Sequence, residues 1–145
     1  MLYYHQINDR VIVEMTNTHK QSTVLIHSSI ETTWNALTNE HTLTQWYAPG
    51  SSWSIPNLKK GEKMLFTLMP NQHNQLTESL PMDLIIEEII PYQEFSFSFD
   101  SQKEKVSFIL EKSPEGTLVS TNTLGYDESL ANLKALLESN ALPYV

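Results

Sequence analysis

The chain has 145 residues, 40% hydrophobic and 18% charged, which is enough for one globular domain with a core of its own. Its 9 basic and 17 acidic residues give a net charge of −8, which disfavours DNA, RNA and anionic membranes as partners. Cysteine is absent, which excludes disulfides, thiolate metal sites and cysteine nucleophiles. The sequence shows no signal peptide and no apolar run long enough to cross a bilayer, so we expect a cytoplasmic protein.

Residues 1–21 are the least regular part of the sequence. RVIVEMT, at 10–16, alternates like a strand, and NTHK, at 17–20, would turn it back into a hairpin with the next strand. The alternative is an extension that packs against a second copy of the chain. We therefore divide the chain into an N-terminal strand or extension, 1–21, and a single domain, 22–145.

The block SSIETTWNALTNEHTLTQWY, at 28–47, predicts two short helices. The apolar positions share one face over 30–37 and another over 40–47, and Asn39 between them is a good cap for the second helix. Ser28 and Glu31 fit a capping box at the start of the first helix. Helices this short are unstable alone, so a sheet must hold both.

A DNA-binding helix-turn-helix motif is the specific alternative interpretation of residues 28–47. Such a module contacts phosphates through lysine and arginine side chains. The sequence has neither residue over 21–58. The alternative is therefore disfavoured on charge.

Most of the remaining chain reads as antiparallel strands. The predicted strands are short, rich in β-branched and aromatic residues, and several alternate with period two: 23–28, 53–55, 62–69, 82–90, 94–100, 105–111 and 117–124. In FSFSF, at 95–99, the phenylalanines share one face and the serines the other. The connectors PYQE, DSQK and SPEG are short and turn-like, which favours antiparallel neighbours.

The last segment changes to a helical period. YDESLANLKALLESNA predicts a helix over about 127–140 with Asp127 as its N-cap. Leu130, Leu133, Leu137 and Ala141 lie on one face of that helix. This stripe must be buried, and the phenylalanine face of the sheet is the expected partner.

Four stretches together resemble a known family. VLIHSSIETTWNALTNEHTLTQWYAPG, LKKGEKMLF, IIEEIIPYQEFSFSF and FILEKSPEGTLVSTNT follow the order and spacing of the family named for the activator of the heat-shock-protein-90 ATPase. The resemblance covers residues 22–140. It departs from the family pattern in keeping only Gly61 of a glycine pair and only Pro91 of a proline pair. The last helix also lacks an initial tryptophan, and Tyr126 is the nearest aromatic residue.

That family lies in the START-related, birch-pollen-allergen-like superfamily. The resemblance implies an α+β helix-grip fold, in which a curved antiparallel sheet of six or seven strands wraps a long C-terminal helix and leaves a cavity. It also implies that Trp34 braces the first short helix and that Trp46 and Tyr47 border the cavity entrance.

The candidate ligand-binding residues are apolar and aromatic side chains expected at this cavity or its rim. Trp and Tyr combine an apolar body with a polar tip, which suits an entrance. Each phenylalanine is individually more typical of plain core. The predicted set is Trp46, Tyr47, Trp53, Phe66, Phe97, Phe99, Leu130, Leu133 and Leu137.

The sequence shows no catalytic, metal or cofactor motif. The five histidines lack metal-ligand spacing, and His27 is expected to be solvated. Glu87 and Glu88 are adjacent in a predicted strand, so their side chains are expected on opposite faces and not in one acid–base pair.

We therefore predict that the protein binds a small hydrophobic or aromatic molecule between the sheet and the C-terminal helix. An enzyme of cyclase, dehydratase or hydrolase type acting on such a molecule is the alternative. A chaperone ATPase activator or a surface interaction module is a further one. A homodimer is left open as well, since residues 1–21 are one candidate for packing against a second copy.

Overall fold

The computed structural model describes residues 22–72, 74–100 and 104–145, so the strand or extension predicted over 1–21 lies outside the described residues. Within this part of the chain, three helices pack against one antiparallel sheet of seven strands. The strands are β1 (Ser22–Ile26), β2 (Ser52–Ser54), β3 (Lys63–Leu68), β4 (Leu80–Ile90), β5 (Glu94–Phe99), β6 (Lys105–Ser113) and β7 (Gly116–Thr121). The helices are α2 (Ile30–Thr38), α3 (Glu40–Trp46) and α4 (Asp127–Leu137). These elements confirm the predicted helix-grip fold.

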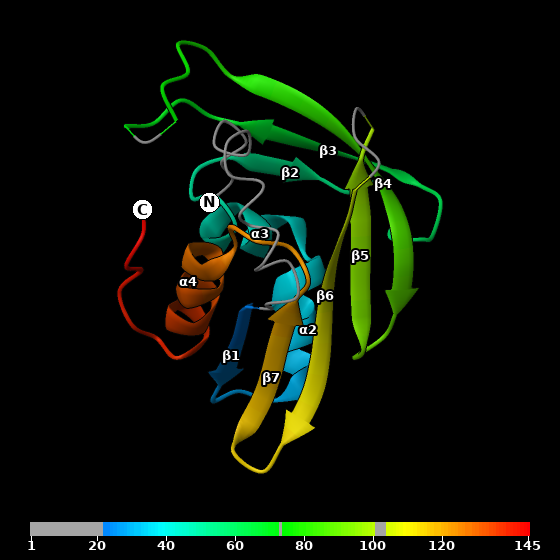
Figure 1. The fold of residues 1–145 in the computed structure, drawn as a ribbon, viewed down its shortest axis with the longest axis vertical. Helices are drawn as coiled ribbons and strands as arrows, with labels where there is room; N and C mark the ends of the chain where they lie inside the picture. The colour runs from blue at the N-terminus through cyan, green and yellow to red at the C-terminus, as the bar shows by residue number, and fades with distance from the viewer. Residues whose placement is uncertain (1–21, 73, 101–103) are drawn as a thin grey trace.

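The strand order in the sheet is β1-β7-β6-β5-β4-β3-β2. From β2 to β7 each strand pairs with the next one along the chain, as the short connectors predicted. The pair α2–α3 carries the chain from β1 at one edge to β2 at the other. The sheet curves around the helices, and α4 lies beside β1 (Figure 1).

Asn39 joins the two short helices, as predicted. Its backbone N–H donates to the Asn35 carbonyl and so ends α2. Its side-chain oxygen accepts from the backbone amides of His41 at 2.9 Å and Thr42 at 3.2 Å, which caps α3. The predicted capping box of Ser28 and Glu31 is wrong, because the cap lies one residue later and a threonine, Thr32, stands three residues after it. Ser29 is the N-cap and accepts from Thr32, because the chain is still turning out of β1 one residue earlier.

The bounds of α4 also differ from the prediction. Asp127 is the first helical residue, and Tyr126 stands before it without a side-chain cap. The helix ends at Leu137, because Ser139 adopts a left-handed conformation with φ of 61° and the Asn140 amide returns to the Ala135 carbonyl. The predicted stripe therefore loses its last member, Ala141, which follows the helix.

The two tryptophans of the helical pair have different environments. Trp46 is fully buried, and its indole N–H donates to the Ala36 carbonyl at 3.0 Å. Trp34 is half-buried and meets the exposed ring of Tyr92 edge-on at 6.2 Å. Trp46 is thus the tryptophan that packs the two helices into the core. Trp34 lies at the surface of α2, against Tyr92.

A β-bulge in β4 overturns the expectation for the paired glutamates. The register with β5 shifts between Ile86 and Glu88, so Glu88 stands opposite Ser96. Glu87 accepts a hydrogen bond from Ser98, which lies on the same face of β5 as Ser96. Both carboxylates therefore lie on the serine face of the sheet, since the extra residue of a bulge breaks the alternation.

Trp46→Ala should destabilise the protein by about 3–5 kcal/mol, because it removes a fully buried ring and leaves a cavity. Trp34→Ala should cost clearly less, since part of that ring already meets solvent. Equilibrium urea unfolding of the two variants measures the difference. An equal loss of stability in both would contradict the environments described for the two rings.

Candidate functional site

The structure brings most of the predicted ligand-binding residues into one aromatic interior. We use this name for Trp46, Tyr47, Trp53, Phe66, Phe97, Phe108 and Tyr126, all of which are buried. The ring of Tyr47 lies at its centre, 4.8 Å from Trp53 and 5.3 Å from Phe66 between centroids. Leu130 and Leu133 of α4 are also buried, whereas Phe99 and Leu137 are half-buried at the margin of the core.

Two phenol groups meet inside this interior. The hydroxyls of Tyr47 and Tyr126 share a hydrogen bond. Burial raises the pKa of both groups well above the usual tyrosine value, and the neighbouring Tyr126 raises the pKa of Tyr47 further. Both phenols therefore stay protonated at neutral pH. The sequence signal for Tyr126 was its place just before the last helix.

The indole N–H of Trp53 adds a further polar group to the interior. It is buried and has no hydrogen-bond partner in the part of the chain that the structure describes. Buried donors of this kind are uncommon in folded proteins. The aromatic interior is thus lined by apolar ring surfaces but also contains hydrogen-bond donors, namely the two phenol hydroxyls and this indole N–H.

The buried polar side of α4 fixes the helix against α3. Ser129 donates its hydroxyl to the Tyr47 carbonyl at 2.7 Å. Asn132 exchanges two hydrogen bonds with the backbone of Tyr144, at 2.8 and 2.9 Å. These contacts hold both α4 and the segment after it, and the leucine pattern alone did not reveal them.

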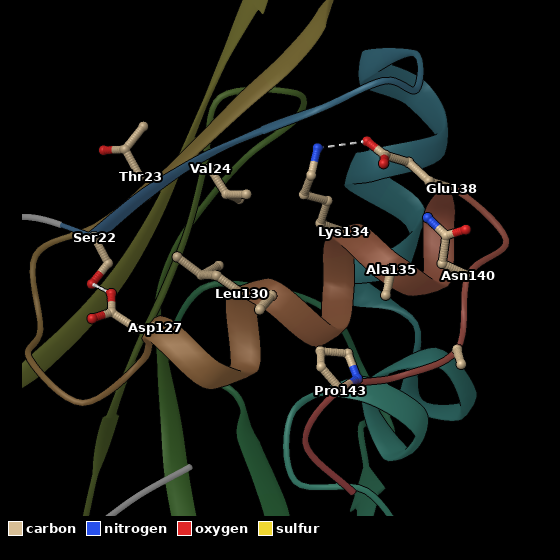
Figure 2. Close-up of a pocket in the computed structure, with 12 residues that line it drawn as sticks. Ser22, Thr23, Val24, Asp127, Leu130, Lys134, Ala135, Glu138, Asn140 and Pro143 are labelled. Carbon is tan, nitrogen blue, oxygen red and sulfur yellow. Dashed lines mark hydrogen bonds and ion pairs between the residues drawn. The ribbon is translucent and has the colours of Figure 1, made fainter.

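A pocket of about 330 Å³ lies between β1 and α4 (Figure 2). Of the predicted ligand-binding residues, Leu130 lines it. The lining residues come from β1, α4 and the segment after α4: Ser22, Thr23, Val24, Asp127, Leu130, Ala131, Lys134, Ala135, Glu138, Asn140, Ala141 and Pro143. Ala131 and Ala135, one helical turn apart, contribute small apolar side chains to the lining. Apart from Leu130, no residue of this pocket was predicted from the sequence as ligand-binding.

One end of the pocket is closed by a group of polar contacts, which we call the Glu138 clasp. The carboxylate of Glu138 accepts from the His27 amide at 2.8 Å, the His27 ring at 2.9 Å and the Lys134 ammonium at 2.9 Å. Lys134 also donates to the Leu25 carbonyl at 2.7 Å. The His27 amide first, and then Lys134, lower the pKa of Glu138 to about 2.

Charged groups elsewhere in the described ranges do not gather into a metal site. Among the described residues, no group of three or more His, Asp or Glu side chains is placed to hold a metal ion. None of the described helices is long and apolar enough to cross a membrane.

The sequence from residue 27 to 133 matches the model of the family described as Activator of Hsp90 ATPase homolog 1-like protein. The chain belongs to this family. No curated protein matches the sequence. Family membership agrees with the fold, since the START-related superfamily has the same sheet and C-terminal helix.

Solved structures share this fold at low sequence identity. A protein from Staphylococcus saprophyticus is 17% identical, with a TM-score of 0.65 over 86% of this chain and 96% of its own. An AHSA1-like protein from Aeromonas hydrophila is 20% identical, with a TM-score of 0.66 over 82% and 91%. The Aha1 dimer from Colwellia psychrerythraea is 18% identical, with a TM-score of 0.59 over 81% and 94%.

Acid should weaken the Glu138 clasp. Because the pKa of Glu138 is about 2 in the folded chain and 4.5 ordinarily, its stabilisation is complete above pH 4.5 and lost as the pH falls toward 2. Glu138→Gln should lower the melting temperature at pH 7 and reduce its change between pH 4.5 and 2. Glu115→Gln, at an exposed turn, is the matched control and should follow the wild type. Parallel curves for all three proteins would contradict this role of Glu138.

Proposed function

We propose that this protein binds a small apolar or aromatic molecule in the pocket between β1 and α4. The pocket itself is the observation that supports the proposal, because it is open space between the sheet and the C-terminal helix. Its volume of about 330 Å³ lies at the lower end of the range of ligand sites in proteins. The ligand is therefore small.

The chemistry of the lining favours an apolar ligand. The apolar lining residues are Val24 of β1, Leu130, Ala131 and Ala135 of α4, and Pro143 after it. Figure 2 shows Val24 on the β1 side of α4 and Pro143 on the other side of the helix. The charged groups lie at the ends. Such an arrangement recognises the size and shape of a molecule more than its charge.

The aromatic interior is the alternative location for the same ligand. It contains most of the side chains predicted from the sequence, and Leu130 belongs both to the core and to the pocket wall. The rings of Tyr47, Trp53 and Phe66 are packed against one another there. A ligand in the interior would have to displace these rings, whereas the pocket requires no such movement.

A thermal-shift titration with indole, 1-naphthol and n-octanol tests the proposal. A ligand at one hundred times its dissociation constant adds about 2.7 kcal/mol to the free energy of unfolding. For a domain of this size, that stabilisation raises the melting temperature by on the order of 5–10 °C. No shift with any of these probes at saturation would contradict the proposal.

Two matched variants locate the ligand. Ala131→Phe places a ring in the pocket and should abolish the shift, while Asn35→Phe adds the same ring at an exposed position of α2 and should preserve it. If the ligand still raises the melting temperature of Ala131→Phe, the pocket is not its binding site, and the aromatic interior becomes the location to test.

We also propose that the chain forms homodimers, because a relative of the same fold is described as a dimer. Sedimentation velocity over a range of protein concentrations should show a species of twice 16.6 kDa. A single species of 16.6 kDa at every concentration would contradict it.

A further inference from the structure

Within the part of the chain that the structure describes, β1 has a backbone edge that no other strand pairs, and this edge faces the pocket. One side of β1 pairs with β7, and the other side faces α4. The Leu25 carbonyl meets the Lys134 ammonium, and the His27 amide meets the Glu138 carboxylate. These two contacts identify the backbone groups that point away from β7.

Strand geometry extends this assignment to Thr23. The N–H and C=O of one residue in a strand point to the same side, and that side alternates along the chain. Thr23 precedes Leu25 by two residues, so its N–H and C=O also point toward α4. Figure 2 shows the Thr23 side chain directed away from α4, and its hydroxyl lies 3.1 Å from that of Ser120 in β7. Because Thr23 is nevertheless a lining residue, we infer that it lines the pocket through its backbone.

The charged side chains around the pocket already have partners. Asp127 accepts from the Ser22 hydroxyl, and Lys134 and Glu138 are joined within the clasp. An acidic or basic group of a ligand would have to compete with these contacts. The backbone pair of Thr23, by contrast, is not taken by any α4 side chain in the described part of the chain.

We propose that the ligand of this pocket carries a secondary amide, as in an N-acylated apolar amino acid or a short apolar peptide. The N–H of this amide donates to the Thr23 carbonyl, and the carbonyl on the other side of the same ligand α-carbon accepts from the Thr23 amide, as in the addition of a strand to a sheet edge. Its apolar side chain lies against Leu130, Ala131 and Ala135. This inference rests on the proposed function of the pocket and names the class of its ligand.

A pair of probes that differ in one group tests the inference. N-acetyl-L-valine methyl ester has the required N–H, and methyl (S)-2-acetoxy-3-methylbutanoate has an oxygen in its place. Losing one hydrogen bond, and covering the Thr23 carbonyl with a ligand that gives it no donor, should weaken binding by about tenfold. Titrations followed by amide chemical shifts of β1 and α4 measure both affinities.

Thr23→Pro provides the complementary change in the protein. It removes an N–H that faces away from β7, which an edge strand tolerates, so the β1–β7 ladder stays intact. The variant should lose about tenfold in affinity for N-acetyl-L-valine methyl ester and keep its affinity for n-octanol. Thr23→Ala retains the backbone amide and should bind both probes as the wild type does.

The outcomes separate the two proposals. Equal binding of the amide and its oxygen analogue, together with binding of n-octanol, overturns the amide inference and leaves the apolar pocket in place. If neither n-octanol nor the other probes bind, the proposed function fails as well. If Thr23→Pro does not fold, the two probes on the wild-type protein decide the question.

Discussion

An open sheet has two edges whose backbone groups need partners, and the helices of this protein supply partners at both. At β1, Lys134 and Glu138 of α4 take the Leu25 carbonyl and the His27 amide. Beyond β2, Glu40 of α3 accepts from the Ile55 amide at 2.7 Å. Uncovered edges invite pairing with other chains, and helix side chains that bond to them reduce this risk. The positions of α3 and α4 at opposite edges follow from this constraint.

The aromatic interior fills the space that these helices enclose with the sheet. Large rings meet edge to face there, and such contacts stabilise a core beyond the burial of their area. The hydroxyls of Tyr47 and Tyr126 satisfy each other, which allows two phenols to be buried side by side. Ser129 binds the Tyr47 carbonyl, so the rings and the start of α4 are held as one unit.

The pocket exists because this packing is incomplete on the β1 side of α4. Leu133 is fully buried, whereas Ala131 and Ala135 line the open space. This space combines an apolar lining with a length of strand backbone. Family membership accounts for the fold of this chain, whereas recognition of a ligand depends on these particular side chains. That difference is general, since one fold supports many unrelated sites.

The sequence by itself determined several features that depend on near neighbours in the chain, although it misplaced the caps at Ser28 and Asp127. The alternation of FSFSF, the cap at Asn39 and the burial of Leu130 and Leu133 in the last helix are local patterns, and each appears in the structure where it was predicted. Tertiary structure decided the rest. The bulge that places Glu87 and Glu88 on one face depends on how β4 pairs with β5. The sequence of β4 alone carries no information on that pairing. Thr23 and Ala135 are 112 positions apart in the sequence, and only the folding of α4 back onto β1 makes them two walls of one pocket.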